Sequence, residues 1–293
     1  MRNFNENTIT AAVLARFGDA GSTRVTELSA ALVRHVHAFI RETRPTQAEW
    51  AAGIDFLTRT GQMCSETRQE FILLSDVLGV SMLVDAINHP LPEGATETTV
   101  LGPFHRADAP ELSRGSAIAA GSAGVPLFVE GTVRQSGGAP IAAATIDTWH
   151  ADGAGFYDVQ RGEGSAPDLD LRARFRTDEQ GRFWFRSIVP SCYPIPNDGP
   201  VGQMLRAQGR YPYRPAHIHF MIAAAGFETL VTHVFLAGDP YLDSDVVFGV
   251  KDSLIRELHR QERGRTRDGH EVDQPIAVLH YDFVLSHRSG EMP

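Results

Sequence analysis

Two histidines in one short segment are the first residues whose types and spacing could do chemistry. They lie in the run Arg214-Pro-Ala-His-Ile-His-Phe220. Alternate side chains of a β-strand point to the same face, so His217 and His219 would project together while Ile218 faces the core. Two imidazoles on one face suit Zn, Fe, Cu or Ni. Taken alone, such a pair is more often two half-exposed strand histidines.

Two tyrosines lie in unusual settings and could complete a metal site. Tyr193 lies in Val189-Pro-Ser-Cys-Tyr-Pro-Ile-Pro-Asn-Asp-Gly-Pro-Val-Gly202, where prolines and an Asp-Gly-Pro turn fix the backbone. Tyr157 lies just after a strand-like run, in Ala151-Asp-Gly-Ala-Gly-Phe-Tyr-Asp-Val-Gln160. For an isolated tyrosine, packing with a hydrogen-bonded hydroxyl is the usual role.

The four residues together favour a hard trivalent cation. The pKa of a phenol lies near ~10, so tyrosine is a poor ligand at neutral pH unless such a cation stabilises the phenolate. Two tyrosinates and two neutral histidines would leave a net charge of about +1 on a ferric centre. A zinc hydrolase would need further His, Cys or carboxylate ligands, and a ferrous oxygenase a nearby carboxylate. The sequence does not clearly offer either.

In their order along the chain, these motifs resemble those of the intradiol ring-cleavage dioxygenases. The likeness covers nearly the whole chain, including Leu101-Gly-Pro-Phe104. It implies one Fe(III) per subunit, and the ligands that it implies are Tyr157, Tyr193, His217 and His219.

The resemblance also assigns roles to residues around the metal. Arg214 is expected to lie beside the bound ring and to stabilise its developing negative charge. Tyr193 is expected to leave the metal and take a proton when a diol binds. His233 stands where catechol-cleaving relatives commonly carry glutamine, so it either supports the metal ligands from behind or is a core histidine.

A substrate pocket is the next feature that the resemblance implies. Asp76 is unusual there because it interrupts the apolar run 71–79, and an acid is costly to bury unless it is hydrogen-bonded. A third substrate hydroxyl could be its partner, although Asp76 could also cap a helix or pair with an arginine. The residues that match the family's pocket are Leu73, Asp76, Val100, Leu101, Gly102, Pro103, Phe104, Ile195, Pro196, Arg214, Val247 and Phe248.

The segment around Asp76 looks most like that of the hydroxyquinol-cleaving members of the family. The implied reaction cleaves benzene-1,2,4-triol with O2 to 3-hydroxy-cis,cis-muconate, which tautomerises to maleylacetate. Cleavage of catechol or chlorocatechol is the alternative within the class. A metal-free, transthyretin-like binding protein and a zinc hydrolase are more distant alternatives.

The elements that must position these residues fall into two parts. Helices are expected over 26–43, after a capping box at Thr46-Gln-Ala-Glu49, and from Ser65 to before Pro90. The third helix contains the most apolar long stretch, 71–87, and is expected to be buried.

From about Pro126, short strand-like runs alternate with turn signals, which is typical of a β-sandwich. We therefore expect a mainly β protein with an α-helical N-terminal part: a helical domain over 1–105 and a β-sandwich catalytic domain over 106–293. The resemblance implies that the helices form a homodimer interface, where relatives bind a phospholipid. Residues 161–170 are expected to form a surface loop. The strand-like runs are 127–133, 146–149, 174–176, 182–186, 217–223, 229–236 and 277–285.

Composition excludes several classes of function. The 293 residues carry a formal net charge of −9, and the basic residues are scattered apart from one arginine-containing stretch at 260–267, so a nucleic-acid partner is not expected. No segment is apolar enough to span a membrane. There are two cysteines, which offer no disulfide framework, and the N-terminus lacks a signal-peptide core. A cytoplasmic location is therefore expected.

Overall fold

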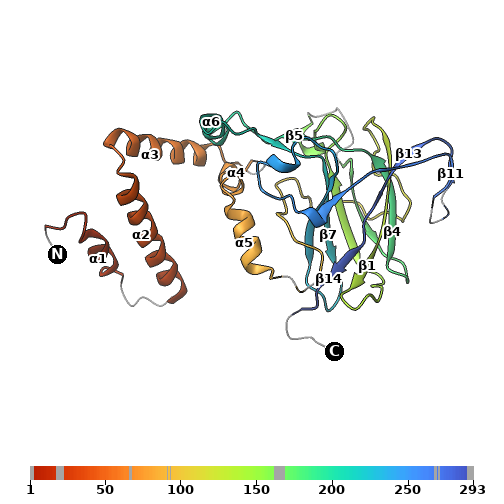
Figure 1. Ribbon diagram of the computed structural model, residues 1–293, viewed down its shortest axis with the longest axis horizontal. Coiled ribbons are helices and arrows are strands. Elements are labelled where there is room, and N and C mark those ends of the chain that lie inside the picture. The colour runs from red at the N-terminus through yellow and green to blue at the C-terminus, as the bar shows by residue number, and fades with distance from the viewer. Residues whose placement is uncertain are drawn as a thin grey trace. The chain divides into compact units, whose positions relative to one another are not determined.

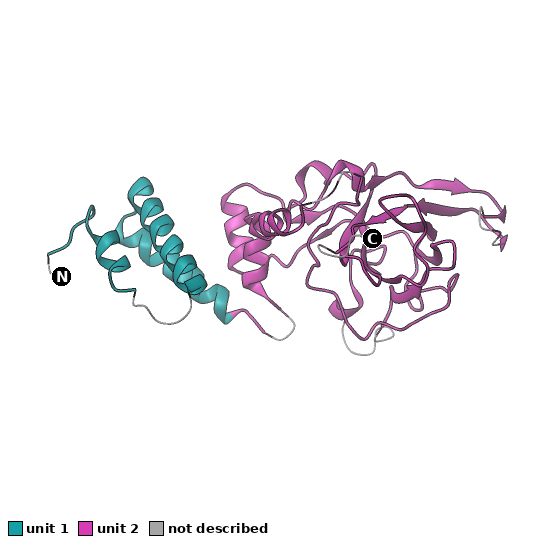
Figure 2. Cartoon of the chain, turned by 90° about the horizontal axis from the view of Figure 1, so that it is seen from below, with its two compact units in different colours: residues 1–62 teal, residues 63–293 magenta. Residues whose placement is uncertain are grey.

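The computed structural model describes residues 3–17, 23–65, 68–90, 92, 94–161, 169–266, 269 and 271–288. By their internal contacts the residues form two compact units, 1–62 and 63–293, which Figure 2 distinguishes by colour. The contacts thus divide the chain after Gln62, whereas the sequence placed a domain boundary at 105/106. That boundary stays a prediction.

The first unit is helical, as expected. It contains α1 (Ile9–Leu14), α2 (Thr23–Thr43) and α3 (Gln47–Gln62). The capping box before α3 is confirmed, because the Thr46 backbone N donates to Glu49 Oε2 at 2.7 Å and the Glu49 backbone N donates to Thr46 Oγ1 at 3.2 Å. Large apolar side chains of α2 and α3 are exposed within the unit, among them Leu28, Leu32, Val36, Phe39, Trp50, Ile54 and Leu57.

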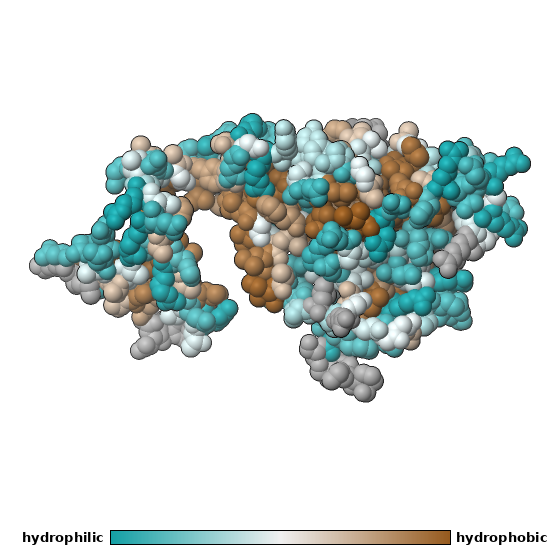
Figure 3. Space-filling model, viewed as in Figure 1, coloured by the Kyte–Doolittle hydropathy of each residue, from teal (hydrophilic) through white to brown (hydrophobic). Residues whose placement is uncertain are grey.

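The predicted third helix is two helices, α4 (Glu70–Val77) and α5 (Val80–Asn88). The helix is interrupted at Gly79, whose φ of +72° lies in the left-handed region that favours glycine. The expectation of a buried helix is also wrong: α5 has no buried residue, and Leu83 and Ile87 are exposed. Figure 3 shows apolar side chains gathered on the surface over α5.

The second unit contains the expected β-sandwich (Figure 1). One sheet has the order β3-β2-β7-β8-β9, and the other has the order β10-β13-β1-β14 with β4 paired to β1. Rings from the two sheets meet in the core: Phe175 stacks on Phe185 at 5.2 Å, and Phe183 meets Phe220 at 6.2 Å between centroids. The strands of the first sheet are β2 (Thr145–His150), β3 (Arg172–Arg176), β7 (His217–Ala223), β8 (Leu230–Leu236) and β9 (Ile255–Arg256). The strands of the second are β1 (Pro126–Gln135), β4 (Arg182–Ile188), β10 (His259–Gln261), β13 (Ile276–His280) and β14 (Phe283–Leu285).

The remaining elements of the second unit are short. They are α6 (Pro200–Ala207), the two-residue strands β5 (Tyr193–Pro194), β6 (Tyr213–Arg214), β11 (Gly264–Arg265) and β12 (Glu271–Val272), and the 3-10 turns η1 (Asp158–Gln160), η2 (Leu242–Ser244) and η3 (Asp252–Leu254). Of the expected loop 161–170, residues 162–168 lie outside the described part of the chain.

The predicted strand 277–285 is two strands that both pair in parallel with β1. The backbone approaches β1 closely at this interruption: a Cβ on Gly131 of β1 would lie 1.8 Å from the Tyr281 carbonyl oxygen. Asp282 uses the break to accept hydrogen bonds from the backbone N and the hydroxyl of Thr132, at 2.9 and 2.7 Å. Among the described residues, no helix combines the length and the apolar character needed to cross a bilayer.

Candidate metal centre and substrate pocket

Strand pairing brings the predicted site residues together. Both His217 and His219 are buried on β7, the strand that the sequence predicted over the same residues. The short β5–β6 ladder places Tyr193 opposite Arg214. Tyr157 is fully buried where β2 has ended and η1 begins. Three separate segments therefore converge on one point.

Oxygen and nitrogen atoms of the four proposed ligands lie within hydrogen-bonding distance of one another. Tyr157 Oη is 3.4 Å from Tyr193 Oη, 3.4 Å from His217 Nε2 and 3.0 Å from His219 Nε2. The two Nε2 atoms are 3.1 Å apart. His217 Nδ1 lies 2.7 Å from the Pro215 carbonyl oxygen, which places the proton on Nδ1 and a lone pair on Nε2. The lone pair of His217 Nε2 therefore faces Tyr157 Oη and His219 Nε2 and is available to a cation placed between them.

The electrostatics of this cluster suit a cation. Burial lowers the pKa values of His217 and His219 well below the ordinary range, so both imidazoles are neutral at neutral pH. Burial raises the pKa of Tyr157 well above its ordinary value, and it also raises the pKa of Tyr193. The phenols would lose their protons at neutral pH only beside a strong positive charge. Two such oxygens with two imidazole nitrogens fit a hard trivalent ion.

His233 is the third member of a histidine cluster. The ligand atoms of His217, His219 and His233 lie within 4.8 Å of one another, so the cluster could hold a metal ion. His233 pairs with His219 across β7 and β8, and the two rings meet edge-to-face at 4.1 Å. Its Nδ1 also lies 3.3 Å from Arg214 Nη2. These contacts favour a role for His233 in positioning the proposed histidine ligands over the role of an ordinary core histidine. That role stays a prediction.

Arg214 is a buried cation with an acid partner. Its Nε lies 3.2 Å from Asp245 Oδ1, and its Nη1 lies 3.3 Å from His217 Nε2. Asp245 is itself held by the backbone N of Gly249, which donates to Oδ2 at 2.9 Å. Arg214 stays charged because its ion pair outweighs the cost of burial, and its pKa lies above the ordinary value. The guanidinium is thus fixed beside Tyr193.

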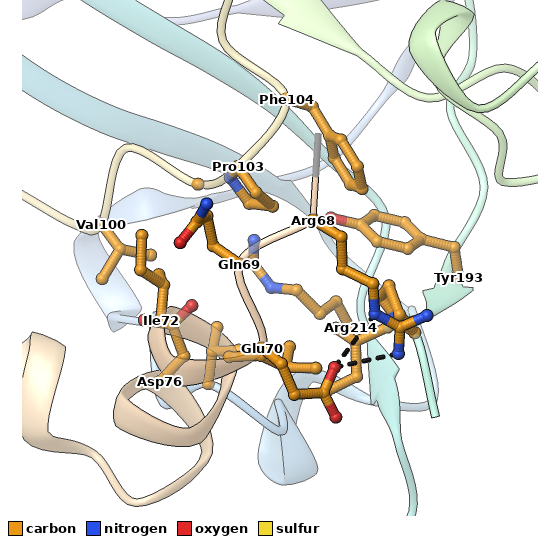
Figure 4. A pocket seen from close by; sticks show the side chains of 15 residues that line it. Arg68, Gln69, Glu70, Ile72, Asp76, Val100, Pro103, Phe104, Tyr193 and Arg214 are labelled. Atoms are coloured by element: carbon orange, nitrogen blue, oxygen red, sulfur yellow. Dashed lines mark hydrogen bonds and ion pairs between the residues drawn. The ribbon is translucent and has the colours of Figure 1, made fainter. Parts of the chain in front are cut away.

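The pocket beside this centre lies between α4, the segment 100–104 and β5 (Figure 4). Ten of the twelve predicted residues line it, and Leu101 and Phe248 do not: both side chains are exposed. The Phe104 ring stacks on the Tyr157 ring at 4.4 Å, so the pocket wall directly contacts one of the proposed ligands. The lining residues are Arg68, Gln69, Glu70, Ile72, Leu73, Asp76, Val100, Gly102, Pro103, Phe104, Tyr193, Ile195, Pro196, Arg214 and Val247.

Asp76 is a buried acid in the pocket wall, with an exposed fraction of 7%. Burial raises its pKa, while hydrogen bonding to Ser81 and the charge of Arg214 partly oppose that rise. The neighbouring charge of Asp245 raises the pKa further. The carboxyl would therefore gain from a polar partner inside the pocket.

Several residues of the site were not expected from the sequence. Asp245 could have been sought, because a buried arginine requires a counter-ion. Arg68 and Glu70 gave no such signal: they form an ion pair of 2.9 Å at the edge of the pocket, marked by the dashed lines in Figure 4. Gln69 and Ile72 also line the pocket without having been predicted.

Comparisons with known proteins agree with this geometry. Residues 102–287 match the family model described as Dioxygenase, and residues 22–96 match the one described as Catechol dioxygenase N terminus. A hydroxyquinol 1,2-dioxygenase of Rhizobium sp. (strain MTP-10005) is 53% identical over 94% of this chain and 93% of that protein. A 6-chlorohydroxyquinol 1,2-dioxygenase of Cupriavidus pinatubonensis is 52% identical over 98% and 99%.

A solved structure gives the same result for the fold. The hydroxyquinol 1,2-dioxygenase of Pseudomonas putida DLL-E4 superposes with a TM-score of 0.91 at 45% identity, covering 97% of this chain and 99% of that one. Family models, full-length relatives and fold thus point to one class. The chain belongs to the intradiol ring-cleavage dioxygenases.

Proposed function

We propose that this dioxygenase cleaves hydroxyquinol, benzene-1,2,4-triol, between its adjacent hydroxylated carbons. The product is 3-hydroxy-cis,cis-muconate, which tautomerises to maleylacetate, and both atoms of O2 enter it. The relatives named for hydroxyquinol and 6-chlorohydroxyquinol support this substrate. Independent support comes from Asp76, a buried acid in a largely apolar wall that a third ring hydroxyl could satisfy.

The metal that we propose is Fe(III), one per subunit, held by Tyr157, Tyr193, His217 and His219. The convergence of two phenol oxygens and two Nε2 atoms carries this proposal. Bound there, Fe(III) would supply Lewis acidity toward the diol hydroxyls and would activate the electron-rich ring toward O2.

The protein groups around the metal would manage protons and charge. Tyr193 Oη is the atom that we expect to accept a proton from the bound diol, because burial raises the pKa of this phenol and so favours its protonated form. Arg214 lies opposite Tyr193 and is locked by Asp245, so its positive charge is fixed beside the ring and can stabilise developing negative charge.

The apolar pocket wall would orient the ring and exclude water. Phe104 packs on Tyr157, while Ile195 and Val247 belong to a buried apolar cluster. Rigid walls of this kind hold a planar substrate in one orientation, which lowers the entropic cost of reaching the transition state. The polar Asp76 then distinguishes the end of the ring that carries the third hydroxyl.

Oxygen uptake measured in parallel with hydroxyquinol, catechol and 4-chlorocatechol tests the substrate. We expect the highest kcat/KM for hydroxyquinol; an equal or higher value for catechol would contradict the assignment. Metal analysis and colour test the cofactor, because tyrosinate-to-Fe(III) charge transfer should make the protein red. A colourless protein that stays inactive after loading with iron would overturn the proposed centre.

We also propose that the enzyme forms a homodimer through its N-terminal helices. The exposed apolar side chains of α2 and α3 support this proposal, since a second copy would remove them from water. Light scattering of the purified protein tests the dimer. A bound phospholipid, for which lipid extraction is the test, and a cytoplasmic location both remain predictions.

A further inference from the structure

Arg172 is a buried arginine, 2% exposed, on the strand β3 beside the metal centre. Its Nε donates to Asp158 Oδ2 at 2.5 Å, and its Nη2 pairs with Asp158 Oδ1. Its Nη1 donates to the Phe104 carbonyl oxygen at 3.0 Å. One guanidinium therefore binds two segments that are far apart in sequence.

Each of these two segments carries a residue of the proposed site. Asp158 directly follows Tyr157, and Phe104 is a wall of the pocket. The Tyr157 and Phe104 rings stack at 4.4 Å with an angle of 29° between their planes. We propose that Arg172 is a positioning residue that fixes Tyr157 and Phe104 relative to each other, and so couples the metal centre to the substrate pocket. The proposal rests on the proposed role of Tyr157 as an iron ligand.

The Asp158 carboxylate is well suited to transmit this constraint. Besides Arg172, it accepts the backbone N of Val159 at 2.8 Å and the backbone N of Asp170 at 3.3 Å. The Tyr157 backbone N is itself held by Gln160 Oε1 at 2.9 Å. The turn that carries Tyr157 is therefore tied on both sides of the tyrosine, and the carboxylate has little freedom to move.

The geometry requires arginine and not merely a positive charge. A guanidinium presents its N–H donors in a planar fork that can bind a carboxylate through two atoms and still reach a third acceptor. A lysine ammonium is a point charge on a flexible stem and cannot reproduce this arrangement. Arg172→Lys thus keeps the charge while it removes the constraint.

Arg174 provides a matched control on the same strand. It lies two residues further on, on the same face of β3, and it also bridges a buried acid and a carbonyl. Its Nη2 lies 3.1 Å from Asp147 Oδ2 and 3.1 Å from the Ala107 carbonyl oxygen. Neither partner adjoins a proposed ligand, so Arg174→Lys removes a comparable bridge without releasing Tyr157. Its cost in stability should be smaller, because the Arg174 side chain is 29% exposed.

The test compares the two lysine variants with the wild type after iron loading. The readouts are the charge-transfer band, iron content, kcat and KM for hydroxyquinol, and the midpoint of thermal unfolding. We expect Arg172→Lys to shift the band, to raise KM and to lower kcat/KM by about tenfold to a hundredfold, because small displacements of reacting groups are costly. Arg174→Lys should leave the band in place and lose less stability than Arg172→Lys, because the Arg174 ion pair is partly exposed.

Asp158→Asn keeps the size of the side chain and weakens the same link, so it replaces Arg172→Lys if that variant does not fold. An unshifted band with an unchanged KM in a folded variant, or equal changes in the Arg174 control, would overturn the positioning role. A wild-type protein without iron, colour or activity would instead overturn the proposed function.

Discussion

Asp76 is a single carboxyl whose surroundings make it sensitive to the substrate. Its pKa is raised by burial, and it lies in the wall of a largely apolar pocket. We expect Asp76→Ala to lower kcat/KM for hydroxyquinol by about tenfold to a hundredfold, since a hydrogen bond to a charged group contributes about 1.5–3 kcal/mol. Catechol lacks the third hydroxyl, so its kcat/KM should change much less. Parallel oxygen-uptake assays measure both, and equal effects on the two substrates would remove Asp76 as a determinant of specificity.

Gly102 is a residue without a side chain that lies against one of the proposed ligands, His219. Its φ is +77°, and a Cβ there would lie 3.1 Å from Cε1 of His219. Gly102→Ala should therefore strain the backbone by about 1 kcal/mol and also press on the His219 ring. We expect reduced iron content and reduced kcat, measured by metal analysis and oxygen uptake.

Gly209→Ala is the matched control for this substitution. Gly209 has a φ of +67°, but a Cβ there meets nothing within 4 Å. Its variant should lose a similar amount of stability and keep its iron and its activity. If both variants lost iron equally, the effect would come from backbone strain and not from contact with His219.

At the level of the elements, Glu70 joins the N-terminal ends of α4 and α6. It is fully buried, accepts the backbone N of Val201 at 3.2 Å and pairs with Arg68 at 2.9 Å. Glu70→Ala leaves a buried N–H without its acceptor, and we expect it to lower the free energy of unfolding by about 2 kcal/mol. This loss of unfolding free energy is smaller than that expected for a fully buried ion pair, because Arg68 is partly exposed.

Asp198→Ala serves as the comparison, because Asp198 binds the same arginine from an exposed position, at 2.8 Å. Exposed ion pairs contribute little, so this variant should lose less than about 1 kcal/mol. Urea-induced unfolding measures both variants. Equal losses would show that Arg68, and not the link between the two helices, determines stability here.

The sequence predicts the elements whose pattern is local. Alternation on β7 gave its bounds and the shared face of His217 and His219, and the Thr46 capping box gave the start of α3. The breaks at Gly79 and Tyr281 could not be predicted in this way. Glycine is compatible with a continuing helix, and the break at Tyr281 coincides with a close approach to Gly131 of another strand, which is a non-local contact.

The same distinction applies to the site. The four proposed ligands lie in motifs that can be recognised one segment at a time. Asp245 pairs with Arg214, 31 residues away, and Arg172 pairs with Asp158, 14 residues away. The segments around Asp245 and Arg172 contain no motif that would identify them. Their contribution becomes visible only once folding has brought the segments together.

For the molecule as a whole, buried histidines should make stability depend on pH. His150 on β2 and Ser187 on β4 form a hydrogen bond of 2.6 Å between the two sheets, and burial lowers the pKa of His150 to about 4. The folded state keeps this imidazole neutral, whereas the unfolded chain binds a proton near pH ~6.5. The stabilisation is therefore complete above pH ~6.5 and is lost as the pH falls toward about 4.

Replacing His150 should reduce by one the number of protons that the protein takes up when it unfolds at acidic pH. For one group, the free energy of unfolding falls by up to about 1.4 kcal/mol per pH unit in this range. Burial also lowers the pKa values of His217, His219 and His233, so these residues add slopes of the same sign to the metal-free protein. His150→Gln should remove one such slope and leave the others. Urea unfolding of the metal-free wild type and variant between pH 7.5 and pH 5 (about 1 unit above and about 1.5 units below ~6.5) measures the difference. Parallel curves would show that His150 does not titrate on unfolding.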